Sequence, residues 1–465
     1  MSKRNAFVEK TGRYTVALLG CGVSNAPLAR FFLSRGNKVT LRDAREASEL
    51  PDEILALTKE GLSLRLGKTW LDGLTEKLIL RSPGMRPERF PAILEASAQG
   101  AHVTTEAGLF LEAAHVPVLG VTGSDGKSTT ATLTAAILRE SGYRVFLGGN
   151  IGTPLLSQID EMKNGDVAVM ELSSFQLYDA AQSPTVAAVT NLSENHLNWH
   201  ADMAEYRAAK ARILRRGSYR VLSADCDALL PFYESGVTAL FSTKKSYGEL
   251  RRLHGDVPVA YVEDGFFFFR HKEKKEALLP VGEFALSGDY NRKNLLTAYL
   301  LARPYIRGDA LYRAATAAKP LPHRMELVAE KDGVTYYDSS IDSSPARSTV
   351  TLEALSVPAV VIMGGRGKNL SYDALPPLLA KKARAVVLTG ENASELSRVL
   401  SESDAFRESG VPFFLESDMD AAVRRARRLS QKGDAVLLSP AATSFDRYKN
   451  FAARGNAFKK AVEAL

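Results

Sequence analysis

The stretch Val116–Thr130, with the sequence VPVLGVTGSDGKSTT, sets the architecture of the central part of this chain. Its first residues, up to Val121, form an apolar run that predicts a buried strand. The turn Thr122–Gly126 follows, and Lys127 opens an amphipathic helix that should end at Gly142. A strand, a Gly-rich turn and a helix N-terminus together form a cradle for an anion, because backbone N–H groups point toward it. The stretch therefore predicts a phosphate-binding loop.

This loop could bind a nucleotide or be a structural turn with a solvated lysine. The usual P-loop pattern has a glycine six residues before its lysine, where this chain has Val121. Gly-Lys-Ser alone would not separate the two interpretations, but the strand before it and the helix after it favour a nucleotide. Lys127 would then reach the outer phosphates, and the Ser128 hydroxyl would bind Mg²⁺. The predicted phosphate contacts are Gly123, Ser124, Asp125, Gly126, Lys127, Ser128 and Thr129.

The composition is that of a globular protein with several domains. The chain has 465 residues, 45% of them hydrophobic and 24% charged, and domains typically hold roughly 100–200 residues. We expect a cytoplasmic protein without membrane insertion, because no apolar run approaches the roughly 20 residues of a membrane helix and the N-terminus lacks a signal-peptide core. The net charge of +7 is spread along the chain. Its densest run, Arg424–Arg428, reads as the solvated face of a helix, so we expect no nucleic-acid partner.

The N-terminal part reads as the opening of a Rossmann-like unit. Its predicted elements are the strand Thr15–Leu19, the turn Gly20–Asn25, the helix Pro27–Arg35 and the strand Lys38–Leu41. Asp43 then stands about where a ribose-binding acid would be. Asn25 replaces the third glycine of the dinucleotide fingerprint, which disfavours an oxidoreductase and leaves another nucleotide open. Arg81–Met85 reads as a second loop at the same sheet edge.

Polar clusters follow strand ends in the central part. They are Gly148–Gly152, Glu171–Gln176 after the strand Val167–Met170, and Thr190–His196 after the strand Val186–Val189. The carboxyl ends of parallel strands share one sheet edge, where ligands bind, so the clusters should converge on the phosphate loop. That convergence favours a nucleotide site more strongly than any single motif.

Three side chains near this edge have a functional and a structural interpretation. Glu171 is the natural carboxylate for Mg²⁺, which prefers hard oxygen ligands shared with phosphates, and the structural alternative is an acid at a helix N-cap. A lone histidine such as His196 is more often structural than a ligand. Lys210 lies on the predicted helix Met203–Arg216, where a surface lysine is the default. Spacing alone leaves these alternatives open.

The remainder of the chain continues the α/β pattern. Asp264–Gly265 predicts a hairpin turn, Asn291–Leu300 a helix, and Lys319–Pro322 a linker. Further strands are predicted at Val334–Tyr337, Val360–Met363, Ala385–Leu388 and Ala435–Leu438, with the loops Gly364–Lys368 and Ser439–Phe445 after two of them. The architecture is thus three α/β units in series.

Several motifs together resemble the Mur ligase family of ATP-dependent amino-acid ligases over nearly the whole chain. They are Thr122–Thr130, Glu171–Leu177, Asn191–His196, Lys210, Asn294 and Arg324. Four segments resemble most closely the family members that add D-glutamate: RSPG at Arg81–Gly84, GGNIG at Gly148–Gly152, ELSSFQL at Glu171–Leu177 and SPAATSFDRYKNF at Ser439–Phe451.

The resemblance implies an α/β protein of three domains and a defined reaction. Residues 1–105 would form a Rossmann-like domain binding the UDP-sugar, 106–320 a P-loop ATPase domain with a mostly parallel sheet, and 321–465 a Rossmann-like domain binding the amino acid. The implied enzyme is a monomer that uses ATP and Mg²⁺ to join D-glutamate to UDP-N-acetylmuramoyl-L-alanine in peptidoglycan precursor synthesis. An acyl phosphate is the intermediate, and ADP and phosphate are released.

The resemblance also assigns residues to each ligand. Beyond the phosphate loop, the implied ATP contacts are Asn294, Arg324 and Asp338. The implied UDP-sugar contacts are Ser24, Asn25, Asp43, Arg45, Ser82, Gly84 and Asn150. The implied D-glutamate contacts are Lys368, Ser444, Phe445 and Phe451. The implied metal ligands are Ser128, Glu171, His196 and a carbamylated Lys210, and the implied catalytic residues are Lys127, His196 and Lys210.

The chain departs from the family pattern in two places. Asn195 and Asn198 flank His196, where family members commonly have acidic residues. The family's D-S-K-A-T-like segment corresponds to Asp338–Pro345, which contains no lysine. Its register stays open, since starting at Asp338 and anchoring at Pro345 give different partners.

Other functions fit the sequence less well. A folylpolyglutamate synthetase would begin close to its P-loop, the alanine-adding sibling differs at ELSSFQL, and the diaminopimelate- or lysine-adding sibling differs in its C-terminal acceptor motif. A P-loop switch NTPase, from another class, would need a base-reading motif that is not found.

Overall fold

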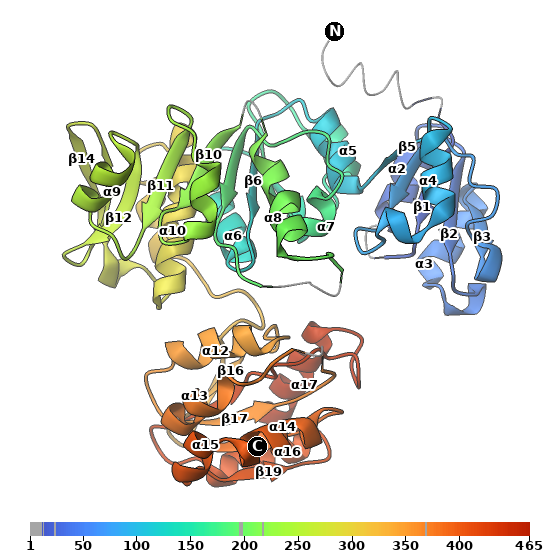
Figure 1. The fold of residues 1–465 in the computed structure, drawn as a ribbon. Coiled ribbons are helices and arrows are strands. Elements are labelled where there is room, and N and C mark those ends of the chain that lie inside the picture. Colours follow the sequence, from blue (N-terminus) through green and yellow to red (C-terminus); the bar gives the residue numbers. More distant parts are fainter. Residues whose placement is uncertain (1–11, 13, 23–24, 195–198, 216–217, 368–369) are drawn as a thin grey trace. The chain divides into compact units, whose positions relative to one another are not determined.

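The computed structural model describes residues 12, 14–22, 25–194, 199–215, 218–367 and 370–465. The chain forms two compact units, Met1–Ala318 and Lys319–Leu465. Figure 1 shows three sheets with helices around them, one in the blue part of the chain, one from cyan to yellow, and one in orange and red. The fold is therefore of the predicted α/β class.

The first sheet is entirely parallel. Its strands are β1 (Val16–Leu19), β2 (Val39–Asp43), β3 (Ser63–Leu66), β4 (Leu78–Arg81) and β5 (His102–Thr104), in the order β3-β2-β1-β4-β5. The helices α2 (Asn25–Leu33), α3 (Asp52–Ala56) and α4 (Pro91–Ala98) belong to the same part of the chain. The strand order reverses between β1 and β4, and crevices at such points hold ligands in open α/β sheets. The turn after β1 and the loop after β4 meet there.

The second sheet has nine strands. They are β6 (Val118–Thr122), β7 (Val145–Gly149), β8 (Val167–Glu171), β9 (Val186–Val189), β10 (Tyr219–Ser223), β11 (Thr238–Ser242), β12 (Val259–Glu263), β13 (Phe266–His271) and β14 (Lys274–Pro280). Their order is β14-β13-β12-β11-β10-β9-β6-β8-β7, parallel except for the pairings of β13. Asp264 and Gly265 both have positive φ, as the predicted hairpin turn requires.

Helices cover the central strands of this sheet. They are α5 (Glu106–Ala113), α6 (Lys127–Glu140), α7 (Ser174–Leu177), α8 (Met203–Ala211), α9 (Tyr247–His254), α10 (Asp289–Ala302) and α11 (Ala310–Thr316). On one face, buried Leu119 and Val121 of β6 share a hydrophobic core with Ile137 of α6 and Leu296 of α10. Val118 points to the opposite core, because side chains alternate along a strand. β6 is therefore buried on both sides, which fixes the start of the phosphate loop.

The second unit contains the third sheet. Its strands are β15 (Glu326–Lys331), β16 (Val334–Asp338), β17 (Ala359–Met363), β18 (Ala383–Leu388), β19 (Phe413–Leu415) and β20 (Ala435–Leu438), in the order β15-β16-β20-β17-β18-β19. Its helices are α12 (Pro345–Ala354), α13 (Leu375–Lys382), α14 (Ala393–Glu402), α15 (Asp404–Glu408), α16 (Met419–Leu429) and α17 (Phe451–Glu463). Only β15 runs antiparallel within this described sheet.

Two predicted helices have different ends in the structure. α2 begins at Asn25, two residues before the predicted start at Pro27. The N–H groups of the first helical turn have no acceptor within the helix, so a proline, which has no N–H, is tolerated inside that turn. α8 ends at Ala211 and continues as a 3₁₀ turn, Arg212–Leu214, in which Ile213 and Leu214 are buried. In the described part of the chain, no helix combines the length and the apolar character of a membrane span.

Candidate active site

The phosphate loop follows β6 and needs glycine at two positions. Gly123 has φ +147°, and a Cβ there would lie 1.9 Å from Oγ1 of Thr190. Gly126 has φ +81° at the N-cap of α6, and a Cβ there would lie 2.3 Å from Oδ1 of Asn294. Both positions combine a backbone conformation that favours glycine with no room for a side chain. The loop conformation is thus fixed by Thr190, just after β9, and by Asn294 of α10.

Hydrogen bonds from the β9 loop hold the phosphate loop before any ligand binds. The Asp125 amide donates to Oδ1 of Asn191 at 3.0 Å, and Oγ1 of Thr190 donates to the Asp125 carbonyl at 2.6 Å. The Ser193 amide donates to Oγ of Ser124 at 2.9 Å, and this hydroxyl lies 2.9 Å from the hydroxyl of Tyr206. A loop preorganised in this way loses little entropy when it binds phosphate.

The side chains of the loop gather at the start of α6. Nζ of Lys127 donates to the carbonyls of Gly123 at 3.0 Å and Ser124 at 2.8 Å. Ser128 is half-buried, and Thr129 is buried with no hydrogen-bond partner on Oγ1. Oγ1 of Thr130 donates to Asn294 at 3.3 Å, which joins α10 to this helix. The structure therefore brings Asn294, which is distant in sequence, to the phosphate loop.

Lys210 of α8 is a buried lysine under the phosphate loop, so the default interpretation of a surface lysine is wrong. Its side chain is almost fully buried. Nζ donates to the Gly123 carbonyl at 2.7 Å and to Oγ1 of Thr122 at 3.2 Å. Burial and the neighbouring charge of Lys127 lower its pKa well below the ordinary value, against the opposing effect of Asp125 and Glu171. The protein environment of Lys210 therefore disfavours the charged ammonium form.

Glu171 ends β8 with one carboxylate oxygen satisfied and one free. Oε1 accepts from Nδ2 of Asn150 at 2.8 Å. Oε2 is buried and has no hydrogen-bond partner. A buried carboxylate oxygen without a donor is costly unless a cation or a proton compensates it. Glu171 therefore fits a Mg²⁺ ligand, and its bond to Asn150 joins the expected metal site to an expected UDP-sugar residue.

Three predicted site residues lie outside the described residues. They are Ser24, His196 and Lys368. Their predicted roles rest on the sequence.

The predicted UDP-sugar loops meet at the reversal point of the first sheet. A Cβ on Gly20 would lie 2.7 Å from Oγ of Ser82, which donates to the Leu19 carbonyl at 2.7 Å. The Asn25 side chain donates back to the Gly20 carbonyl. Two segments more than 50 residues apart are therefore in direct contact at this edge.

The acid after β2 is tied to the same turn. Oδ2 of Asp43 accepts the Cys21 amide at 2.5 Å and Nη2 of Arg45 at 2.9 Å. These hydrogen bonds lower the pKa of Asp43 although burial opposes them. Asp43 therefore stays ionised and orders both the turn and Arg45.

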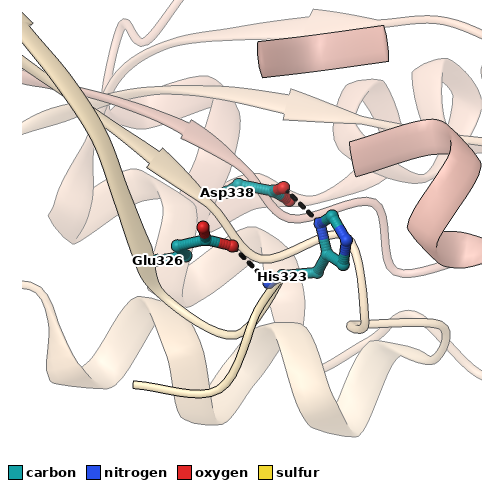
Figure 2. A group of neighbouring side chains, drawn as sticks. All are labelled: His323, Glu326 and Asp338. Atoms are coloured by element: carbon teal, nitrogen blue, oxygen red, sulfur yellow. Dashed lines mark hydrogen bonds and ion pairs between the residues drawn. The ribbon is translucent and has the colours of Figure 1, made fainter. Parts of the chain in front are cut away.

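In the second unit, His323, Glu326 and Asp338 form a compact cluster, drawn in Figure 2. Nδ1 of His323 donates to Oδ2 of Asp338 at 2.7 Å, and the His323 amide donates to Glu326 at 2.7 Å. Asp338 has no exposed surface, and its Oδ1 accepts the Ser340 amide at 2.8 Å. His323 also has a left-handed backbone, φ +62°, a strained conformation typical of functional sites. Asp338 and Arg324 are predicted ATP contacts. The cluster fixes the side chain of Asp338 and the backbone of His323, which precedes Arg324.

Gly455→Ala should damage this cluster. A Cβ on Gly455 of α17 would lie 2.2 Å from Nδ1 of His323 and 2.5 Å from Oδ2 of Asp338. We expect a loss of about 1–3 kcal/mol in the free energy of unfolding, as for other overpacked cores, measured by thermal unfolding. Gly248→Ala in α9 is the matched control, because nothing lies within 4 Å of a Cβ there. It should leave stability unchanged or raise it; equal behaviour of the two variants would contradict the steric account.

A buried arginine of α17, Arg454, holds the segment just before the predicted D-glutamate contact Ser444, and this role was not predicted from the sequence. Nε and Nη2 of Arg454 donate to Ser340, at 3.0 Å to Oγ and 2.8 Å to the carbonyl. Nη1 donates to the carbonyls of Ala442 at 3.0 Å and Thr443 at 3.1 Å, just before Ser444. Burial lowers the pKa of Arg454 to about 10. A lone arginine is most often a surface residue, so no local sequence pattern predicts this role.

The described residues of the predicted D-glutamate site differ in their solvent exposure. Ser444 is buried, whereas Phe445 is 61% and Phe451 39% exposed. The Phe451 carbonyl accepts Oγ of Ser340 at 2.8 Å, which ties the start of α17 to the lysine-free segment after β16. Arg454 and Ser340 thus stabilise a segment where the family pattern has a lysine.

Glu106 gives the first unit a pH-dependent stability. Its Oε1 accepts the Leu156 amide at 2.9 Å, and burial raises the pKa of Glu106 from 4.5 to about 7. The folded state therefore holds the proton more tightly than the unfolded state. Stability should be lost as the pH rises from about 4.5 to about 7, by at most about 3 kcal/mol.

Glu106→Gln should remove that dependence, because the amide cannot ionise. We expect the unfolding temperature of the variant, relative to the parent protein, to be higher at pH 8 than at pH 5. Glu95→Gln at an exposed position of α4 is the control. A difference between Glu106→Gln and the parent that is the same at both pH values would contradict the assignment.

Two family models match the chain. The model of the Mur ligase middle domain matches residues 121–302, and the model of the Mur ligase glutamate ligase domain matches residues 323–442.

The curated relatives match over the full length. A relative from Acetivibrio thermocellus is 36% identical over 477 aligned residues, covering 100% of this chain and 99% of its own. A relative from Symbiobacterium thermophilum is 38% identical, covering 97% of this chain and 98% of its own. Both are named UDP-N-acetylmuramoylalanine--D-glutamate ligase.

Solved structures share the fold at low identity. The UDP-N-acetylmuramate-alanine ligase of Thermotoga maritima matches with a TM-score of 0.61 at 16% identity, over 97% of this chain and 99% of its own. A pseudomurein peptide ligase from Methanothermus fervidus matches with a TM-score of 0.58 at 19% identity, over the same shares. Full-length relatives above 30% identity and two matching family models place this chain in the Mur ligase family.

Proposed function

We propose that this protein is the ligase that joins D-glutamate to UDP-N-acetylmuramoyl-L-alanine at the expense of ATP, in peptidoglycan precursor synthesis. The observation that carries the proposal is the edge of the central sheet. There a preformed phosphate loop, a buried carboxylate with an unsatisfied oxygen at Glu171, and the buried amine of Lys210 lie together. The names of the full-length relatives supply the substrates.

The proposal divides the chain into three functional domains. Residues 1–105 would bind the UDP-sugar through Asn25, Asp43, Arg45, Ser82 and Gly84, with Ser24 from the same turn. Residues 106–320 would bind ATP, and residues 321–465 would bind D-glutamate. The support is that each predicted loop follows a strand end of its own sheet. We further propose that the enzyme acts as a monomer in the cytoplasm, where free cysteines such as Cys21 and Cys226 stay reduced.

The chemistry is two successive transfers. The alanine carboxylate of the UDP-sugar attacks the γ-phosphate of ATP, so that ADP leaves and an acyl phosphate forms. The amine of D-glutamate then attacks the acyl carbon, loses a proton, and phosphate leaves as the amide forms. Phosphoryl transfer depends mainly on positioning and on neutralising charge. Lys127 and the N–H groups of the loop would position the phosphates of ATP and neutralise their charge.

Magnesium would be held by residues of the same edge. Ser128 and Glu171 fit one ion, and His196 with a carbamylated Lys210 would hold a second. The unsatisfied Oε2 of Glu171 supports this fit. When bound, Mg²⁺ neutralises phosphate charge during transfer. The chain's own contribution is to orient these ligands through Asn150 and the β9 loop.

Transfer of ¹⁸O tests this mechanism. UDP-N-acetylmuramoyl-L-alanine labelled with ¹⁸O in its alanine carboxylate should give phosphate that carries one labelled oxygen for each amide formed. The reason is that the carboxylate oxygen which attacks ATP leaves with the phosphate. A P-loop NTPase that only hydrolyses ATP would release unlabelled phosphate, and that result would overturn the proposal.

A further inference from the structure

The loop Ser82–Met85 after β4 is held by one buried guanidinium. The side chain of Arg81 has no exposed surface. Its Nη1 donates to the carbonyls of Pro83 at 3.1 Å and Met85 at 3.0 Å, with a longer contact of 3.4 Å to the Ser82 carbonyl. The loop has no helix or strand of its own, so these bonds, together with the bond from Oγ of Ser82 to the Leu19 carbonyl, hold its conformation.

The same guanidinium reaches across to the central sheet. Nε and Nη2 of Arg81 donate to both carboxylate oxygens of Asp179, at 2.8 and 2.7 Å, and Nη2 also donates to the Phe175 carbonyl at 3.1 Å. Asp179 follows α7 and is only 25% exposed in its side chain. A bidentate pair of this kind is strong and geometrically specific. Arg81 thus uses its donors on two parts of the chain that are 98 residues apart.

A second, independent bond holds the loop from the same side. Nε1 of Trp199 donates to the Gly84 carbonyl at 2.7 Å. The Trp199 ring packs on Phe175 with ring centroids 4.7 Å apart. The central segments around Phe175 and Trp199 therefore form one surface on which the loop is docked.

We propose that the Arg81–Asp179 pair is a positioning device that holds the UDP-sugar loop in its binding conformation by docking it on the central domain. The inference rests on the proposed function, because it takes Ser82 and Gly84 as UDP-sugar contacts. Its specific content is that Asp179, which belongs to the central sheet and is no predicted substrate contact, controls UDP-sugar affinity through Arg81.

Asp179→Asn is the sharpest variant, because it weakens the crossing bond and leaves the bonds of Arg81 to its own loop in place. Arg81→Lys should disrupt both the pair with Asp179 and the bonds to the loop carbonyls, since an ammonium cannot span two carbonyls and a carboxylate. By calorimetry with UDP-N-acetylmuramoyl-L-alanine, we expect about tenfold weaker binding for Asp179→Asn and a larger loss for Arg81→Lys. The turnover at saturating UDP-sugar and the affinity for the ATP analogue AMP-PNP should change by less than about threefold. Arg81→Lys combined with Asp179→Asn should bind like Arg81→Lys alone, because both act through one contact.

Arg42→Lys is the matched control. Arg42 is also buried, pairs with both oxygens of Glu76 at 3.0 and 3.1 Å, and donates to the carbonyls of Trp70, Asp72 and Gly73. It therefore holds a loop of the same sheet without reaching the central domain. Its thermal stability should fall as much as that of Arg81→Lys while UDP-sugar affinity stays within about twofold.

The outcomes separate the two claims. Wild-type affinity in Asp179→Asn, or an equal loss of affinity in Arg42→Lys, would overturn the positioning role and leave the proposed function intact. Absence of any UDP-sugar binding by the parent protein would overturn the proposed function itself. Trp199→Phe, which loses only the bond to Gly84, should show the same selective loss of affinity; wild-type affinity there would also count against docking.

Discussion

Lys127→Ala should lower ligation turnover at least about a hundredfold in a protein that remains folded. The loss of one electrostatic contact to a transferring group typically costs about 2–4 kcal/mol of transition-state stabilisation. Lys127 stands at the first position of α6, and its Nζ lies within the loop that would hold the phosphates. Its removal also takes away a positive charge that disfavours the charged form of Lys210. The Lys127→Ala variant should therefore lose activity without losing thermal stability.

Steady-state release of ADP and thermal unfolding measure the two parts of this prediction. Lys163→Ala is the control, because Lys163 is exposed just before β8, at the opposite end of that strand from Glu171. It removes the same charge from the same sheet and should keep full activity. A folded Lys127→Ala protein with the turnover of the parent would exclude the phosphate loop as the ATP site.

Lys210→Ala should lower ligation turnover by a factor similar to that of Lys127→Ala, which leaves the enzyme nearly inactive. Added short-chain carboxylates should restore part of this activity. An uncharged amine attacks CO₂ and loses a proton, which gives an N-carboxylate; a charged ammonium cannot do this. Burial holds the pKa of Lys210 well below its ordinary value, and its Nζ lies 2.7 Å from the Gly123 carbonyl. A carbamate there would supply anionic oxygens for Mg²⁺, whereas an ammonium would repel the ion.

Lys210→Arg distinguishes this account from a simple need for positive charge. Arginine carries a permanent positive charge and forms no carbamate under these conditions, so we expect this variant to be as inactive as Lys210→Ala. Rescue of Lys210→Ala by acetate would be followed as phosphate release at increasing acetate concentration. An active Lys210→Arg variant would show that the positive charge, not the carbamate, is what the reaction needs.

The sequence predicted the parts of the site that depend on local pattern. The strand, turn and helix around Lys127 follow from apolar periodicity and from glycines with restricted space. The placement of Glu171 and Asn191 beside this loop follows from the rule that parallel strands end at one edge. The family resemblance is confirmed by the relatives and the family models.

The parts that the sequence did not predict depend on partners far apart in the chain. Arg81 meets Asp179 across 98 residues, and Arg454 meets Ser340 across 114 residues. Each arginine satisfies several carbonyls at once, and no local pattern marks a carbonyl as needing a donor. Lys210 shows the same limit, because an alanine-flanked lysine on a helix gives no sign that Thr122 and Gly123 cover it.

Phosphate release with UDP-N-acetylmuramoyl-L-alanine, ATP and Mg²⁺, against a panel of D- and L-amino acids, tests the central claim most directly. D-Glutamate should support rapid release, because its two carboxylates and its amine must be held together for attack on the acyl phosphate. L-Glutamate should be a poor substrate, since inversion at the α-carbon cannot keep all three groups in place. Equal release with both enantiomers, or release that needs no amino acid, would contradict the assignment of this chain as a D-glutamate ligase.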